Sequence, residues 1–82
     1  MAVNYEKLIK DLVNPLVTHP EDLMVKKFSE EDEMLTIQII VHQDDLGRVI
    51  GKNGRIANAI RTIAYASASR EGKRVTINID SF

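Results

Sequence analysis

Hydrophobic and polar residues follow two different periods along this chain. In the first segment apolar residues recur every three to four positions, which predicts an amphipathic helix. Asn4 is placed to cap this helix, and Pro15 is expected to end or kink it. The apolar stripe consists of Tyr5, Leu8, Ile9, Leu12 and Val13, and continues weakly through Leu16 and Val17.

Three later segments alternate with a period of two, which is typical of half-buried strands. The clearest is 34–42, where the residues expected to point inward are Leu35, Ile37, Ile39 and Val41. Residues 74–79 alternate in the same way, with Val75, Ile77 and Ile79 inward. Residues 22–28 alternate more weakly and contain two lysines, which suit an edge strand. The acidic run SEEDE, residues 29–33, predicts the turn that follows.

Two further helices are expected between the second and third strands. A short helix, capped by Asp44 or Asp45, contains Val49 and Ile50, and a longer one runs from about residue 55 to residue 69. Gly72 is expected to end that unit. The order α-β-β-α-α-β predicts one α+β domain over residues 1–82, with helices on one face of a three-stranded sheet.

Composition excludes several classes of protein. The 82 residues suffice for one small domain, and without cysteine neither a disulfide framework nor a thiolate metal site is available. No apolar run is long enough to cross a membrane and no export signal is visible, so a cytoplasmic protein is expected.

Charge is distributed unevenly although the net charge is only −1. Residues 1–45 carry four lysines and ten acidic residues, whereas residues 46–79 carry seven Lys or Arg and one Glu. Positive charge is therefore expected around the glycine-rich segment at 47–56, where it would attract phosphate. The alternative is that acidic residues simply gather in one solvated hairpin.

The segment GRVIGKNGRI at 47–56 does not match the common nucleotide-binding motifs. Only three residues separate Gly47 from Gly51-Lys52, whereas a P-loop has four, and Asn53 lacks the hydroxyl that a P-loop uses to hold magnesium. A dinucleotide-binding turn would need a glycine where Val49 stands. What remains is a Gly-x-x-Gly turn between two helices, which lets a phosphodiester backbone approach closely.

The longer pattern VIGKNGRIANAIR resembles the signature of KH domains, which clamp single-stranded RNA or DNA with a GXXG loop, here residues 51–54. Because the additional helix and strand precede the core, the chain is similar to type II, bacterial KH domains. Its length and the segment DDLGRVIGKNGRIANAIRTI resemble the KhpA family of small RNA-binding proteins. That resemblance implies a post-transcriptional regulator or RNA chaperone linked to cell elongation and division, self-association, and a KhpB (Jag or EloR) partner.

The resemblance also implies the residues that bind RNA. The two glycines would shape the turn, the two residues between them would touch phosphates, arginines would flank the loop, and aliphatic side chains would form a wall for bases. In chain order these residues are Arg48, Val49, Ile50, Gly51, Lys52, Asn53, Gly54, Arg55 and Ile56. Each aliphatic residue could equally belong only to the core. The loop departs from many relatives in carrying asparagine where they have a second cation or a glutamine.

The long helix has more apolar surface than one sheet requires. Ala57, Ile60, Ala64 and Ala68 fall on one flank, and a second flank contains Ala59, Ile63 and Ala66. The second flank, with Thr62, suggests a homodimer interface, unless the N-terminal helix covers it.

No catalytic residue, cofactor or metal site is nominated from the sequence. His19 and His42 stand far apart, and the histidine and the two aspartates of HQDD are interpreted as surface and capping residues. We therefore expect no enzyme. Two kinds of function remain: a single-stranded RNA-binding module, or a KH fold that acts mainly through protein contacts.

Overall fold

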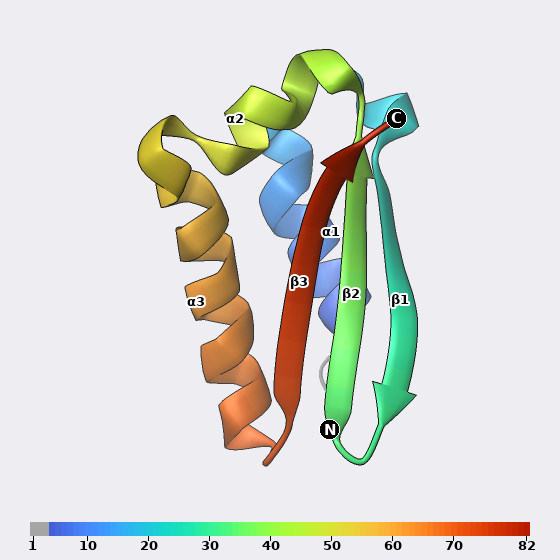
Figure 1. Ribbon diagram of the computed structural model, residues 1–82, viewed down its shortest axis with the longest axis vertical. Helices are drawn as coiled ribbons and strands as arrows, with labels where there is room; N and C mark the ends of the chain where they lie inside the picture. Colours follow the sequence, from blue (N-terminus) through green and yellow to red (C-terminus); the bar gives the residue numbers. More distant parts are fainter. Residues whose placement is uncertain (1–3) are drawn as a thin grey trace.

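The protein, described over residues 4–82 by a computed structural model, is a layer of helices on a three-stranded sheet (Figure 1). Its elements are α1 (Tyr5–Val13), β1 (Met24–Glu31), β2 (Met34–Val41), α2 (Leu46–Ile50), α3 (Arg55–Arg70) and β3 (Arg74–Ser81), with short 3-10 turns between them. The order α-β-β-α-α-β and the α+β class predicted from the sequence are confirmed.

The sheet has β2 in its centre, between β1 and β3. β1 pairs with β2 in the antiparallel direction, whereas β3 runs parallel to β2, with Leu35 opposite Val75 and Ile37 opposite Ile77. A parallel pair needs a long crossover, and here α2, the glycine loop and α3 provide it. The crossover leaves the glycine loop at the far end of the molecule from the β1–β2 turn (Figure 1).

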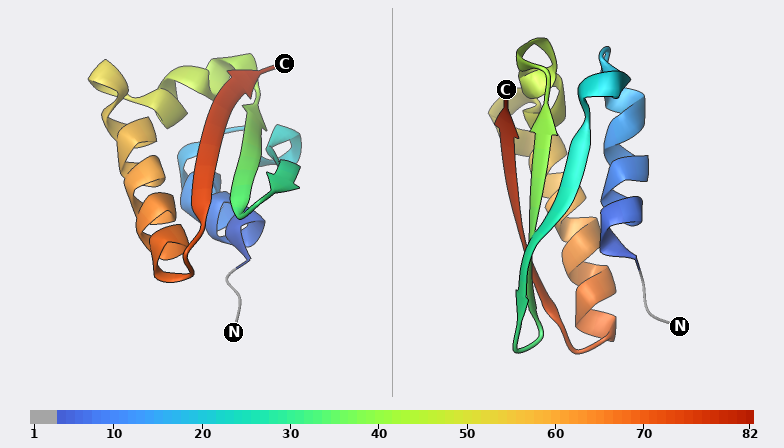
Figure 2. Two further views of the ribbon diagram at one scale, coloured as in Figure 1. Left: turned by 60° about the horizontal axis from the view of Figure 1, so that its bottom comes forward. Right: turned by 90° about the vertical axis from the view of Figure 1, so that its right-hand side faces the viewer.

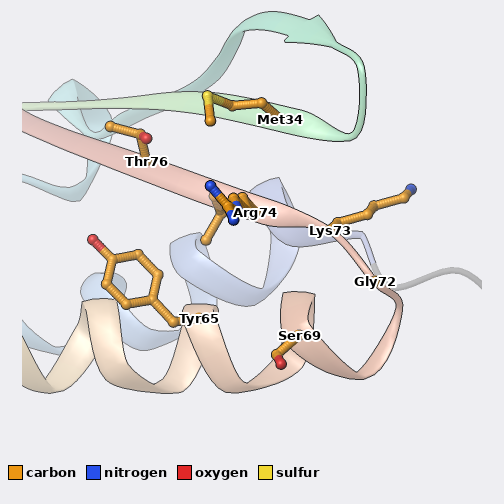
Figure 3. A pocket seen from close by; sticks show the side chains of 8 residues that line it. Met34, Tyr65, Ser69, Gly72, Lys73, Arg74 and Thr76 are labelled. Carbon is orange, nitrogen blue, oxygen red and sulfur yellow. The ribbon is translucent and has the colours of Figure 1, made fainter.

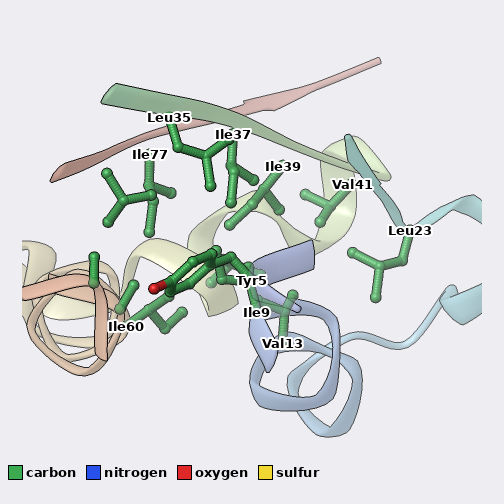
Figure 4. Packing of buried hydrophobic residues seen from close by; sticks show 14 residues of the cluster. Tyr5, Ile9, Val13, Leu23, Leu35, Ile37, Ile39, Val41, Ile60 and Ile77 are labelled. Atoms are coloured by element: carbon green, nitrogen blue, oxygen red, sulfur yellow. The ribbon is translucent and has the colours of Figure 1, made fainter. Parts of the chain in front are cut away.

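Helices α1 and α3 lie on the same face of the sheet (Figure 2). The inward side chains of β2 are fully buried there, against Ile9 and Val13 of α1 and Ile60 and Ala64 of α3 (Figure 4). Ile60 and Ala64 belong to the first of the two apolar flanks that the sequence shows on this helix, together with the buried Ala57 and Ala68. Removal of this apolar surface from water is the main stabilising contribution to the fold.

The ends of α1 follow from local sequence. Asn4 caps the helix, because its side-chain oxygen accepts a hydrogen bond from the Lys7 N–H at 3.1 Å. Pro15 falls in a 3-10 turn, Asn14–Leu16, that ends the α-helix. Both expectations are confirmed.

The acidic run at 29–33 contains the predicted turn, but only in its last two residues, because its first three belong to β1. β1 continues to Glu31, and only Asp32 and Glu33 form the turn, with φ values of 47° and 66°. Glu30 lies opposite Leu35, after a register shift between Lys27 and Ser29. Pairing with the strongly patterned β2 overrides the weak strand propensity of acidic residues.

Asp45 has a different role from the helix capping that was expected for Asp44 or Asp45. Its side chain makes no cap hydrogen bond to α2 and is fully buried. It accepts hydrogen bonds from the Thr18 N–H (2.9 Å), the Thr18 hydroxyl (2.7 Å) and the His19 N–H (2.9 Å). Asp44 does not cap either: the 3-10 turn Gln43–Asp45 is capped by His42, whose Nδ1 accepts from the Asp44 N–H. Asp45 thus ties the segment after α1 to the start of α2.

Replacement of Asp45 by asparagine is expected to lower the free energy of unfolding at pH 7. The variant is also expected to lose less of that free energy in acid than the wild-type protein does. Burial by itself raises the pKa of Asp45, but the hydrogen bonds from Thr18 and His19 and the charge of His19 outweigh it, so the pKa lies below its usual value of 3.8. A lowered folded-state pKa gives stability that is present above the unfolded-state value and is lost as the pH falls through the folded-state pKa.

Urea unfolding followed by circular dichroism measures this effect. The difference between the wild-type protein and Asp45→Asn should be large at pH 7 and should shrink once the pH falls below about 3.8. An equal difference at pH 7 and in strong acid would show that the carboxylate charge contributes nothing. Asp44→Asn is the control, because Asp44 is exposed.

Candidate nucleic-acid interface

The loop between α2 and α3 is a tight turn that depends on left-handed backbone conformations. Gly51, Asn53 and Gly54 have φ values of 76°, 57° and 74°, and Lys52–Gly54 form a single 3-10 turn. The Gly51 N–H closes α2 on the carbonyl of Gly47 at 2.8 Å, and the Gly54 N–H donates to the carbonyl of Gly51 at 3.1 Å. The chain therefore reverses direction and enters α3 within four residues.

The two loop glycines are required to different degrees. A Cβ at Gly51 would lie 2.7 Å from Cγ1 of Ile56, so both the backbone conformation and the packing exclude a side chain there. A Cβ at Gly54 would come no closer than 3.8 Å to the Asn58 side chain, so only its conformation favours glycine. The Ile56 side chain thus packs directly against the backbone of Gly51.

Asn53 suits its position for a reason that was not apparent from charge alone. Its φ of 57° and ψ of 26° lie in the left-handed region, where asparagine is one of the more tolerated side chains. Asparagine at this position thus fits the turn geometry.

Three cations surround the loop. Lys52 and Arg55 are exposed, and over residues 4–82 neither side chain forms a hydrogen bond or an ion pair. Arg48 is 63% exposed, with its Nε only 4.0 Å from Oδ1 of Asp45. Because Gly54, the N-cap of α3, has no side chain, the first N–H groups of α3 receive no side-chain cap. Cationic side chains and a helix N-terminus together favour an anion at this place.

The aliphatic residues beside the loop differ in accessibility. Val49 is fully buried and belongs to the core, so its side chain is not available to a base. Ile50 and Ile56 are half-buried, and Ile56 packs against the core from its edge. The apolar surface next to the loop is therefore formed by Ile50 and Ile56, and Val49 supports it from beneath.

The sequence predicted that the positive charge of the second half of the chain surrounds the glycine loop. In the structure only part of that charge lies there. Arg70, Lys73 and Arg74 lie at the other end of α3, close to the start of β3. Arg61 lies midway and donates from Nε and Nη2 to the carbonyl of Ile77, at 3.4 Å and 3.3 Å. Cations therefore occur along the whole length of the α3–β3 side.

The second flank of α3 remains open in the monomer. All four of its residues are exposed: Ala59, Thr62, Ile63 and Ala66. Ile63 is 43% exposed. The alternative that the N-terminal helix covers this flank is wrong. α1 instead packs against the sheet, and the hydroxyl of the buried Tyr5 donates to Oε2 of Glu71, the residue that follows α3, at 2.7 Å. Burial and the neighbouring carboxylate raise the pKa of Tyr5 to about 12, so this bond persists at neutral pH.

His19 and His42, separated in the sequence, are stacked with ring centroids 3.9 Å apart and planes 23° from parallel. Ligand atoms of His19, His42 and Asp44 lie within 4.8 Å of one another. Nε2 of His19 and Nδ1 of His42 lie 3.7 Å and 3.5 Å from the same oxygen, Oδ2 of Asp44, but Nδ1 of His42 already accepts the Asp44 N–H at 3.0 Å. The sequence did not indicate that His19 and His42 are neighbours, because only the fold brings them together.

None of the described helices is both long and apolar enough to cross a membrane.

Comparison with known proteins identifies the family. Residues 6–79 match the family model described as KhpA/KhpB, KH domain. RNA-binding protein KhpA of Listeria monocytogenes serovar 1/2a is 49% identical over 74 residues, which cover 90% of this chain and 96% of the relative. The KhpA proteins of Oceanobacillus iheyensis and Bacillus subtilis strain 168 are 47% and 43% identical, over 88% and 90% of this chain and 95% and 90% of theirs.

No solved structure gave a significant match. The relatives carry the name of an RNA-binding protein rather than of an enzyme, in agreement with the expectation of no enzymatic activity. A family match over most of the chain, together with the GXXG turn between α2 and α3, shows that this chain belongs to the KhpA/KhpB family of KH domains.

Proposed function

We propose that the protein binds single-stranded RNA and that the loop Gly51-Lys52-Asn53-Gly54 holds the sugar-phosphate backbone. The observation that carries the proposal is the tight turn with positive φ at Gly51, Asn53 and Gly54, in which the two glycines have no side chain and the N-cap of α3 makes no side-chain hydrogen bond. Lys52 at the loop tip, with Arg48 and Arg55 on either side, supplies the opposite charge for phosphates. The name of the KhpA relatives supports RNA as the ligand.

Bases of the bound strand would lie against Ile50 and Ile56. Both are half-buried, so each presents part of its aliphatic surface, and Ile56 also packs against the core. Such a wall offers contact area but few hydrogen-bonding groups that distinguish bases. We therefore infer modest affinity and weak sequence preference, as suits a general RNA chaperone or post-transcriptional regulator in the cytoplasm.

A comparison of single-stranded with paired RNA tests this proposal. An unstructured oligonucleotide should bind clearly more tightly than a perfect duplex of the same length, because the loop and the aliphatic wall receive unstacked bases. Fluorescence anisotropy at one fixed salt concentration measures both affinities. Equal or tighter binding of the duplex would contradict the single-strand proposal.

A protein interface is the second candidate function, and the open flank of α3 favours it. Alanines at 59 and 66 allow close approach of another helix, and Ile63 supplies an exposed apolar centre. We infer a symmetric homodimer through Ala59, Thr62, Ile63 and Ala66, or a similar contact with a KhpB (Jag or EloR) type of protein that links this one to cell elongation and division. The joint name of the family model supports the second partner. Both functions are compatible, because the flank and the loop use different residues.

A further inference from the structure

We propose that a hollow along the edge of β3 binds an additional base of the same RNA strand, stacked on Tyr65. This inference rests on the proposed single-stranded RNA binding and extends it beyond the glycine loop. The hollow has a volume of about 450 Å³ and lies between the second half of α3 and the start of β3. Tyr65 and Ser69 line it from α3, Arg74 and Thr76 from β3, and Met34 from β2 (Figure 3).

Tyr65 is available for stacking in a way that the other tyrosine is not. Its side chain is 45% exposed and projects from α3 toward β3 (Figure 3), whereas Tyr5 is only 5% exposed. The structure of residues 4–82 gives the Tyr65 hydroxyl no hydrogen-bond partner, while the Tyr5 hydroxyl is bonded to Glu71. An exposed aromatic ring at the side of a hollow is the kind of surface on which single-stranded bases stack.

Arg74 adds a positive charge to the hollow. Its guanidinium forms no ion pair or side-chain hydrogen bond within the described part of the chain, although it lies in the hollow beside Tyr65 (Figure 3). Lys73 lies next to it, with its Nζ 4.0 Å from Glu71. A planar guanidinium can stack on a base or pair with the phosphate that follows it.

The hollow and the proposed loop site lie along the same helix, α3. Arg55, at the start of α3, and Tyr65 are ten residues apart on one helix, a distance of about 15 Å. Arg61 lies between them in the helix, about one turn before Tyr65 and on the same side as Tyr65, and donates to the carbonyl of Ile77 in β3. A strand held at the glycine loop can therefore pass Arg61 and reach Tyr65 within a few nucleotides.

Two other occupants fit the structure less well. A peptide added as a strand to β3 would need the outward carbonyl of Ile77, which Arg61 already occupies. A second copy of the chain is expected on the flank that contains Ile63, and at about 100° per residue Tyr65 points roughly 200° away from it. The hollow thus differs from the proposed dimer interface.

The test compares two oligouridylates, one of four nucleotides and one of about ten, by fluorescence anisotropy with full-length protein. Tyr65→Ala should weaken binding of the longer RNA by roughly 5- to 100-fold and leave binding of the tetranucleotide unchanged. Tyr65→Phe keeps the ring and should bind both RNAs as the wild type does. Circular dichroism checks that both variants are folded.

Tyrosine fluorescence gives an independent measurement, because Tyr5 and Tyr65 are the only tyrosines and tryptophan is absent. The longer RNA should quench the wild-type emission, whereas Tyr65→Phe, which retains only the buried Tyr5, should show little quenching. The same quenching in both proteins would contradict stacking on Tyr65.

The outcomes separate this inference from the proposed function. Unchanged binding of the longer RNA by folded Tyr65→Ala, or an equal loss for both lengths, overturns the inference and leaves the loop site standing. A smaller molecular mass of Tyr65→Ala in light scattering would make the hollow a protein contact and would also overturn it. Failure of wild-type protein to bind either RNA would overturn the proposed function together with its extension.

Discussion

Replacement of Lys52 and Asn53 by aspartate is expected to abolish RNA binding without unfolding the domain. Both side chains are exposed at the tip of the loop, so their replacement removes no buried contact. Aspartate tolerates the left-handed conformation at position 53 about as well as asparagine does. The variant replaces one cation and one neutral amide by two carboxylates at the point where phosphates are proposed to lie, so attraction becomes repulsion.

Salt dependence shows whether these positions contact phosphates directly. For single strands, the slope of log K against log salt falls by about 0.7 for each phosphate contact that is lost. Lys52→Ala alone should therefore lower the slope by about that amount and weaken binding of all sequences alike. A variant with the wild-type slope and affinity would show that the loop does not hold the backbone.

A control with the same charge change is available at the other end of the molecule. Asn4→Asp with Lys7→Asp also exchanges one asparagine and one lysine for two aspartates, at the start of α1. Aspartate is a good N-cap, and acidic residues are favourable in the first turn of a helix, so this protein should stay folded. It should bind RNA nearly as the wild type does. Equal loss in both variants would mean that net charge, and not the loop, controls binding.

Ile63→Asp is expected to give a folded monomer. Ile63 is 43% exposed in the isolated chain, so an aspartate there remains solvated and the domain keeps its core. In a twofold dimer the same substitution acts twice and places two carboxylates near the axis, where like charges without partners are strongly unfavourable. Light scattering should show the mass falling from that of a dimer to that of 82 residues.

Tyr65→Asp is the matched control, because Tyr65 lies on the same helix with almost the same exposure, 45%, but on another side. It should remain dimeric. A folded Ile63→Asp protein that stays dimeric would show that this flank is not the interface. Loss of structure in Ile63→Asp would show that the position contributes to the fold more than its exposure indicates.

RNA binding by the monomer separates the two candidate functions. If the loop acts within one chain, folded Ile63→Asp should bind a tetranucleotide as the wild type does. Only an RNA long enough to contact both chains of the dimer should bind more weakly. The interface should depend little on salt, because it is formed by alanines and isoleucine, whereas the loop should depend on it strongly.

The sequence by itself determined the elements whose signals are local. The period of two in β2 and β3, the helical stripe of α1 and the cap at Asn4 depend on residues that are near neighbours in the chain, so they could be predicted without the fold. The same holds for the GXXG turn, because glycine at 51 and 54 satisfies a backbone requirement of a few consecutive residues.

Only the tertiary structure decided the features that depend on contacts between distant segments. Asp45 is buried because Thr18 and His19, 27 and 26 residues away, direct their donors at it. The acidic end of β1 is strand because β2 pairs with it, and Val49 lies in the core, whereas Ile63 remains exposed. Burial and pairing are properties of the surfaces that meet in the folded chain, and a residue's own neighbours in sequence do not specify those surfaces.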